Sequence, residues 1–203
     1  MTRASIRRSL TGEDWADAAL DAIAENGVEA VAVERIARRL GVTKGSFYWH
    51  FTGRDALLEA ALTRWERQQT EDVIARAEME QDGRARIHRL FRGADGSKRA
   101  GQLYLALAAA ANDPQVGAAV NRVNNRRIHF MEQCYQAMGL SGAEARQRAV
   151  LSYSVYLGTL QMRRDAPETI PAGPAFEEYM DYISMVLIPG FTPGAAKSGQ
   201  CAG

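Results

Sequence analysis

Residues 32–51 read AVERIARRLGVTKGSFYWHF and carry the most specific local pattern in this chain of 203 residues. Ile36, Ala37 and Leu40 form one apolar stripe, which predicts a short amphipathic helix. Gly41 adopts a positive φ at little cost, so we expect it to end that helix and begin a tight turn. A second helix of about seven residues is expected to follow. Two short helices joined in this way form a helix-turn-helix.

The second helix of this motif is expected to bury an aromatic side and expose a polar one. Thr43 can cap the helix, and Val42 and Phe47 can form a hydrophobic staple across its first turn. Phe47 and Phe51 lie four residues apart and therefore face inward together. Such a helix exposes groups that contact phosphates and base edges, so the motif predicts binding to duplex DNA. The outward side chains are those of Lys44, Ser46, Tyr48 and Trp49, with His50 at the edge.

Charge is distributed unevenly along the N-terminal part, although the whole chain carries a net charge of only +1. Residues 1–10 hold Arg3, Arg7 and Arg8 and amount to +3, whereas residues 11–30 hold six acids and no base. Residues 31–54, which contain the motif, amount to +4. A basic arm and a basic motif are typical of a face that meets phosphates.

The residues alone leave other functions open. Any amphipathic helix pair joined by glycine can imitate the motif, and Tyr48 and Trp49 would then dock a protein partner in a helical interaction or sensor module without DNA binding. Lys44 and the clustered charges would then belong to an ordinary solvated surface. A helical enzyme with an incidental motif is the other alternative. A salt titration separates these functions, since DNA binding weakens steeply with salt.

The full pattern resembles the TetR family of bacterial transcriptional regulators. The resemblance covers about residues 10–60 and includes Ile36-Ala37, Gly41-Val42 and Gly45 to Phe51, followed by Arg54, Leu57 and Leu58. Ala32 departs from the family, which often has a capping threonine there, and this puts one phosphate contact in question. Together with the pattern, the resemblance implies that DNA is contacted by Arg35, Thr43, Lys44, Gly45, Ser46, Tyr48, Trp49, His50 and Arg54.

The rest of the chain predicts helices throughout, because spacings of three and four residues dominate and strand signals are almost absent. We expect an all-α fold of about nine helices, with a three-helix N-terminal domain and a C-terminal bundle. Residues 1–55 would bind DNA, residues 56–192 would form the bundle, and residues 193–203 would be a disordered tail. Outside the motif, helices are expected at about residues 12–26, 54–79, 97–110, 114–138, 143–165 and 174–188. A further short helix is expected through Ile87, Leu90 and Phe91 and ends at Gly93.

The bundle is expected to form a homodimer, as the resemblance implies. One recognition helix reads only a few base pairs, so a two-fold dimer on a palindromic operator would supply the specificity. Helix 143–165 is apolar almost all round and helix 174–188 carries a wide apolar stripe, which makes them candidate dimer faces. The dimer residues that this pattern indicates are Leu151, Val155, Phe176, Tyr179, Ile183 and Val186.

The resemblance also implies a small-molecule effector. In that family an effector enters the bundle, shifts the fourth helix and releases the DNA, so we expect a repressor. Ordinary core packing is the alternative for each candidate pocket residue. Their aromatic character favours an apolar or aromatic effector, and nothing in the pattern indicates a charged one. The candidates are Trp65, Tyr104, Leu107, Phe130, Tyr153, Tyr156 and Met162.

Chemistry for catalysis or cofactor binding is not indicated. His50, His88 and His129 lie far apart without partners at ligand spacing, so no metal site is expected. The segment after Gly93 lacks the spacing of a phosphate-binding loop. We therefore expect no cofactor and no enzyme activity. Two cysteines, no signal peptide and no long apolar run favour a cytoplasmic protein without a membrane contact.

Overall fold

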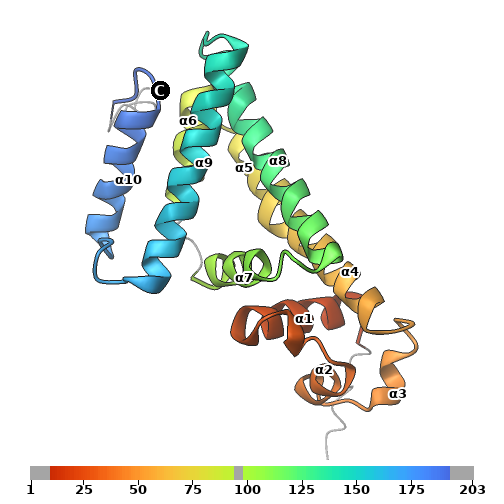
Figure 1. Cartoon of the computed structure of the whole chain (residues 1–203). Helices are drawn as coiled ribbons and strands as arrows, with labels where there is room; N and C mark the ends of the chain where they lie inside the picture. Colours follow the sequence, from red (N-terminus) through yellow and green to blue (C-terminus); the bar gives the residue numbers. More distant parts are fainter. Residues whose placement is uncertain (1–9, 94–97, 193–203) are drawn as a thin grey trace, which may run out of the picture.

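The computed structural model describes residues 10–93 and 98–192, and these residues are helical without a strand (Figure 1). They form nine helical units if the nearly continuous run from residue 54 to residue 78 is counted once, as the sequence predicted. The α-helices are α1 Gly12–Asn26, α2 Val33–Leu40, α3 Lys44–Phe47, α4 Arg54–Glu66, α5 Asp72–Glu78, α6 Gly83–Gly93, α7 Lys98–Ala109, α8 Pro114–Ala137, α9 Gly142–Asp165 and α10 Pro174–Leu187.

Several helices begin at residues whose side chains cap them. Thr11 and Asp14 form a capping box: the Thr11 amide donates to the Asp14 carboxylate at 2.7 Å, and the Asp14 amide donates to the Thr11 hydroxyl at 3.3 Å. Asp113 caps α8, with Pro114 at its first position. The Ser141 hydroxyl accepts an amide hydrogen bond at the start of α9. Each cap pairs amides that a helix start leaves unbonded, so these residues fix where the helices begin.

One hydrophobic cluster joins the N-terminal helices to the near end of the bundle. Helix α1 completely buries Trp15, Ala19 and Ile23, and it packs against both α4 and α7. The cluster continues to Leu107 on α7 and Val116 on α8. Helices α1 to α3 therefore share their core with the helices on which they sit (Figure 1).

A second hydrophobic cluster fills the far half of the bundle, where α5, α6, α9 and α10 surround the second half of α8. Phe91 of α6, Tyr135 of α8 and Phe176 of α10 are buried there. Helices α8 and α9 pack along each other, whereas α10 packs against α6. Figure 1 shows α10 at the opposite end of the molecule from α3.

The helix that connects the two halves contains a wider turn that the sequence did not indicate. We expected an uninterrupted helix to about residue 79, but a π-helical segment, Arg67–Glu71, separates α4 from α5. A π-turn adds a residue to the helix and rotates the side chains that follow. Here it buries Thr70, whose hydroxyl accepts a hydrogen bond from Arg127 Nε at 3.0 Å. Local periodicity cannot reveal a contact between residues 57 positions apart.

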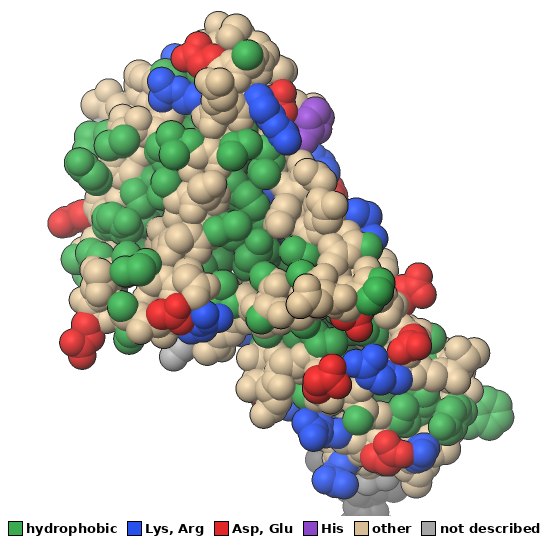
Figure 2. All heavy atoms as spheres, in the orientation of Figure 1, with side chains coloured by type: hydrophobic (Ala, Val, Ile, Leu, Met, Phe, Trp, Pro, Cys, Tyr) green, Lys and Arg blue, Asp and Glu red, His purple; other side chains and the backbone are tan. Residues whose placement is uncertain are grey.

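Apolar side chains remain exposed on the outer faces of α9 and α10. Val150 and Leu151 on α9, and Tyr182, Met185 and Val186 on α10, are between 41% and 60% exposed. Figure 2 shows hydrophobic side chains gathered over these two helices. We expected α9 to be buried on both faces, and a single copy of the chain buries only one of them.

Some expectations fall outside the described residues. These are the basic arm with Arg3, Arg7 and Arg8, the connection that follows Gly93, and the tail 193–203. Of the helices that the structure describes, none combines the length and apolar character needed to cross a bilayer. In residues 10–93 and 98–192, no group of three or more His, Cys, Asp and Glu side chains is arranged to hold a metal ion.

Candidate functional site

The segment from α2 to α3 has the helix-turn-helix backbone that the sequence predicted. Gly41 follows α2 in the left-handed conformation, with a φ of 68° and a ψ of 32°. The Gly41 amide donates to the Arg38 carbonyl at 3.1 Å and the Val42 amide to the Ala37 carbonyl at 3.0 Å. These two bonds form a Schellman ending. Because a side chain is strained at this φ, glycine permits the sharp turn that brings α3 against α2.

Helix α3 is shorter than expected. It spans Lys44–Phe47 and continues as a turn to His50, rather than as a helix of about seven residues. Thr43 occupies the position before the helix, but its side chain makes no capping hydrogen bond, contrary to the prediction. The Ser46 hydroxyl instead donates to the Thr43 carbonyl at 2.8 Å. The Thr43 side chain is thus left at an exposed position.

Phe47 anchors α3 to the core. Its side chain is completely buried, and its ring packs edge-on against Trp15 of α1, with 5.3 Å between the ring centroids. The half-buried Phe51 ring lies 5.5 Å from it, so both rings face inward as predicted. Burying a phenylalanine contributes roughly 1.5–3 kcal/mol to stability. The direction of the remaining α3 side chains is therefore set by this one ring.

The opposite side of α3 presents polar and aromatic groups to solvent. Trp49 is 87% exposed and Tyr48 is 57% exposed. Lys44 and His50 are also exposed, whereas Ser46 is half-buried. Figure 2 shows hydrophobic side chains at the outer edge of this end of the molecule. Large rings in water are unfavourable unless a partner covers them, so this face has the character of a binding surface.

Lys44 has an intramolecular partner on this face. Its Nζ forms an ion pair with the Glu34 carboxylate of α2. The hydrogen bond from Lys44 lowers the pKa of Glu34, and the same bond raises the pKa of Lys44. Both side chains are at least half exposed, so the pair contributes little to stability in water. A phosphate can therefore replace Glu34 as the partner of Lys44 at small cost.

The other predicted DNA contacts differ in availability. Arg35 and Gly45 are exposed, and Arg35 has no carboxylate partner within the described part of the chain. Arg54 instead turns inward, where its Nε donates to the Val31 carbonyl at 3.0 Å. It thereby holds the segment before α2, a role that the sequence pattern does not distinguish from a phosphate contact.

The acidic side chains of α1 face other helices. Asp17 pairs with Arg64 of α4, and Asp21 pairs with Arg99 of α7. A third ion pair joins α1 to α2. Several acids of the block at residues 11–30 are therefore compensated within the chain and connect α1 to the bundle.

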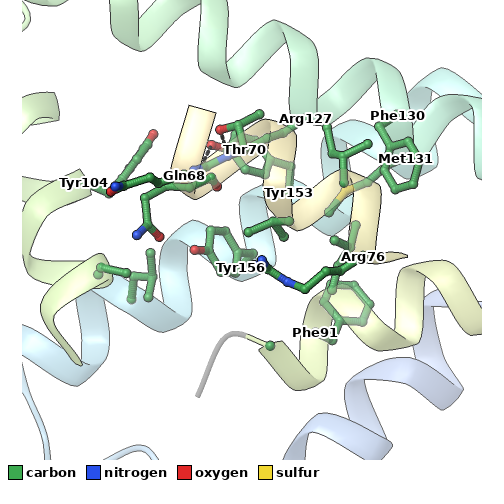
Figure 3. A pocket seen from close by; sticks show the side chains of 18 residues that line it. Gln68, Thr70, Arg76, Phe91, Tyr104, Arg127, Phe130, Met131, Tyr153 and Tyr156 are labelled. Carbon is green, nitrogen blue, oxygen red and sulfur yellow. Dashed lines mark hydrogen bonds between the residues drawn. The ribbon is translucent and has the colours of Figure 1, made fainter. Parts of the chain in front are cut away.

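A cavity of about 300 Å³ lies in the bundle, enclosed by the π-helical segment and by α5 to α9 (Figure 3). Its volume is at the lower end of the range for small-molecule sites. Much of its wall is apolar, with contributions from Leu90, Phe91, Phe130, Met131 and Leu160.

The seven candidate pocket residues divide between this cavity and other places. Trp65 and Leu107 are buried in the first hydrophobic cluster, and Met162 is 39% exposed on α9. None of these three lines the cavity, because helical spacing shows which residues share a face but not which face meets a cavity. The four that line it are Tyr104, Phe130, Tyr153 and Tyr156.

Sequence reasoning missed the polar wall of the cavity. Arg127 of α8 donates three hydrogen bonds there: Nε to the Thr70 hydroxyl at 3.0 Å, Nη2 to the Gln69 carbonyl at 2.8 Å, and Nη1 to the Tyr153 hydroxyl at 3.3 Å. The available signal was a charged residue within the apolar rhythm of α8, between Val123 and Phe130.

A second arginine also lines the cavity. The side chain of Arg76, on α5, runs toward Tyr156 (Figure 3). Burial raises the pKa of Tyr153 and Tyr156, so both phenols remain neutral hydrogen-bonding groups. Among the described lining residues there is no carboxylate.

The candidate dimer residues divide between surface and core. Phe176 and Ile183 are buried where α10 packs on α6, so they belong to the chain's own core. The apolar stripe of α10 is wide enough that its inner edge faces α6 and its outer edge faces solvent. Leu151 and Val186 are more than half exposed, and Val155 and Tyr179 are half-buried.

The N-terminal helices match known proteins in sequence. Residues 16–61 match the family model described as bacterial regulatory proteins, tetR family. Over 46 residues the chain is 46% identical to the transcriptional regulator SrpR of Pseudomonas putida. That match covers 23% of this chain and 22% of SrpR, so it includes only the N-terminal helices.

The whole fold matches solved structures at lower identity. A regulator from Saccharomonospora viridis, in complex with choline, superposes with a TM-score of 0.70 at 16% identity, over 88% of this chain and 96% of its own. The regulator FadR of Bacillus subtilis, in complex with stearoyl-CoA, gives 0.64 at 17% identity, over 89% and 99%. At these identities the likeness concerns the fold. The matched N-terminal residues and the nine-helix architecture make this chain similar to the TetR family of bacterial regulatory proteins.

Proposed function

We propose that this protein is a homodimeric transcriptional repressor that reads a palindromic operator with α3 and releases it when a small molecule occupies the bundle cavity. The observation that carries this proposal is the α3 surface, where Trp49 is 87% exposed two residues after the completely buried Phe47. Such an arrangement costs stability unless a partner covers it. The activity is binding rather than catalysis, and it takes place in the cytoplasm, where bacterial DNA lies.

Duplex DNA is favoured over a protein partner by the charges around α3. Arg35 and Arg38 are exposed without carboxylate partners in the described residues, and Lys44 has only a weak one. Exposed cations beside aromatic rings suit a phosphate backbone and the groove next to it.

A second copy of the chain is the partner that we propose for the exposed apolar face of α9 and α10. Leu151, Tyr182 and Val186 contribute more than half of their side-chain surface to it. A two-fold pairing there would place two copies of α3 on the same side of the dimer. Two recognition helices read twice as many base pairs as one, which supplies the specificity that a single short helix lacks.

Ligand control requires a connection between the cavity and α3. Helix α4, the π-helical segment and α5 form one run that packs on α1 at its beginning and lines the cavity at its end. A ligand that favours another position of this run would change the distance between the two recognition helices. A coupling of about 1–3 kcal/mol alters affinity by roughly 5–150-fold. Two proteins of this fold form complexes with choline and with stearoyl-CoA, which supports a small-molecule ligand for this chain.

The DNA assignment is tested by the double variant Lys44→Ala with Tyr48→Ala. Both side chains are exposed, so we expect an unchanged helical circular-dichroism signal. Affinity for the DNA that the wild type selects should be lost, and wild-type affinity should fall steeply with salt. Retained affinity in the double variant, or affinity insensitive to salt, would sink the assignment and favour a protein-docking surface.

The dimer assignment is tested by Leu151→Glu and Val186→Glu. Each places a charge on the exposed apolar face without entering the core. We expect light scattering to report half the wild-type mass, with the helical signal retained. Ile183→Glu serves as a contrast, because Ile183 is buried and its replacement should unfold α10 instead. Wild-type mass in both surface variants would place the interface elsewhere.

A further inference from the structure

Three arginines of α8 face the connecting helical run, and one of them lacks a carboxylate partner. Arg122 pairs with Glu66 at 2.9 Å, and Arg126 pairs with Glu71 at 3.1 Å. Within the described residues, Arg127 has only neutral acceptors, which are two hydroxyls and a backbone carbonyl. No carboxylate among these residues therefore compensates its charge, although it lies half-buried in the cavity wall.

The guanidinium of Arg127 keeps unused hydrogen-bonding capacity. An arginine side chain has five N–H groups, and three of these donate to Thr70, Gln69 and Tyr153. Each terminal nitrogen therefore keeps one N–H without an acceptor among the described residues. One N–H on each terminal nitrogen is the arrangement that binds both oxygens of a carboxylate.

The surroundings of Arg127 also favour an anion. The Tyr104 ring, with its centroid 5.7 Å from the guanidinium carbon, gives Arg127 a cation–π contact that compensates its charge only in part. The rest of the cavity wall includes apolar groups such as Phe130 and Leu160. The other charged side chain of the described lining, Arg76, is a cation as well. A half-buried cation beside apolar walls is unfavourable until an anion compensates it.

We infer that the cavity binds an amphipathic carboxylic acid, whose carboxylate takes the two free N–H groups of Arg127 and whose aromatic or short aliphatic body lies against Phe91, Phe130 and Leu160. This inference rests on the proposed function and deepens it by naming the chemical class of the effector. The aromatic residues alone favoured an apolar or aromatic effector without a charge, and Arg127 changes that expectation. A cavity of about 300 Å³ suits a single ring or a short chain.

The experiment is a calorimetric titration of the full-length protein, without DNA, with two acids and their matched neutral and cationic analogues. The acids are 4-phenylbutyrate and octanoate, the neutral probes are the corresponding amides, and the cation is octyltrimethylammonium. We expect each acid to bind about tenfold or more tightly than its amide, because charge-assisted hydrogen bonds exceed neutral ones. The cation should not bind measurably.

Two neighbouring arginines provide the matched variants. Arg127→Gln should weaken binding of both acids by about 10–100-fold and leave binding of the amides nearly unchanged. Arg126→Gln removes an adjacent cation that is paired with Glu71 and does not line the cavity, so it should bind the acids as the wild type does. If Arg127→Gln does not fold, the comparison of acid with amide on the wild-type protein still tests the inference.

Three results would overturn the inference: equal affinity for acid and amide, no binding of either acid at about millimolar concentration, or equal losses in both arginine variants. Because the titration contains no DNA, its outcome is independent of operator binding. A protein that prefers the acids but ignores DNA would refute the proposed regulator and keep the carboxylate site. A protein that binds DNA but binds acid and amide equally would keep the proposed regulator and refute the carboxylate site.

Discussion

The two ends of the molecule use aromatic side chains in opposite ways. At α3, Tyr48 and Trp49 project into solvent beside the buried Phe47, whereas in the bundle Tyr104 and Tyr153 line an internal cavity. The first arrangement depends on neighbours in sequence, and the second depends on how helices far apart in sequence meet. A surface site can therefore be identified from consecutive residues, while a cavity also requires the register between helices.

The largest expected effect distinguishes the residue that anchors α3 in the core, Phe47, from a residue that we propose contacts DNA, Trp49. Phe47→Ala should lower the free energy of unfolding by about 3–5 kcal/mol, because it empties a fully buried position beside Trp15. Trp49→Ala should change stability by less than about 0.5 kcal/mol and still abolish operator binding. Urea denaturation and fluorescence anisotropy measure the two properties. Comparable destabilisation by both variants would mean that Trp49 is a core residue and not a contact.

A smaller effect tests packing in the far half of the bundle. A Cβ at Gly83 would lie 2.4 Å from the Cys134 carbonyl oxygen, so Gly83→Ala must push α6 away from α8. We expect a loss of roughly 1–3 kcal/mol in urea denaturation. Arg89→Ala is the control at an exposed position of α6 itself, and it should change stability by less than about 0.5 kcal/mol. If both variants have the same stability, α6 is not held this closely to α8.

The next effect concerns the ion pair between Lys44 and Glu34, on the face that we propose binds DNA. Glu34→Gln frees Lys44 and removes a negative charge near the phosphates, so operator affinity should rise about two- to fivefold. The salt dependence should become steeper for the same reason. Glu29→Gln removes an exposed carboxylate outside this pair and should have a smaller effect. Unchanged affinity in Glu34→Gln would mean that Lys44 does not meet the DNA.

The smallest effect is a pH dependence where α6 meets α10. His88 Nδ1 lies 3.0 Å from the Ser184 hydroxyl, and burial lowers the pKa of His88 although Asp181 opposes the shift. With the pKa depressed in the folded state, neutral His88 contributes stability above the unfolded value of about 6.5. That contribution is lost as pH falls through the folded pKa.

Unfolding free energy should therefore decrease between about pH 7 and pH 5, and less so in His88→Gln. His129→Gln, at an exposed position of α8, should keep the wild-type pH dependence. Urea denaturation at several pH values measures both variants. Identical slopes in His88→Gln and the wild type would show that another group titrates.

Local patterns predicted most of the fold. The capping box at Thr11, the glycine turn at Gly41 and the inward pair Phe47 and Phe51 are each encoded within a few residues, and the structure contains all of them. Most helix boundaries followed for the same reason, but α3 is shorter than predicted and a π-helical segment interrupts the run after α4. Thr43 makes no capping hydrogen bond, and the Ser46 hydroxyl bonds the Thr43 carbonyl instead. The sequence does not show which of these local hydrogen bonds forms.

Contacts between distant helices account for what could not be predicted. The π-helical segment and the polar wall depend on Arg127 reaching Thr70 from another helix. The apolar stripe of α10 was identified, but its inner edge, with Ile183, faces α6, and its outer edge, with Val186, faces solvent. Hydrophobic spacing identifies the residues that form the stripe, but it does not identify what packs against each of its edges.

The most direct measurement is a selection of DNA by the full-length protein from a random-sequence library, followed by sequencing of the captured fragments. We predict strong enrichment of one motif with two inverted half-sites whose centres lie about one helical turn, or a multiple of it, apart. The Lys44→Ala, Tyr48→Ala double variant should enrich nothing. An unenriched library from the wild type, or the same motif from the double variant, would contradict the assignment of α3 as the DNA-reading element.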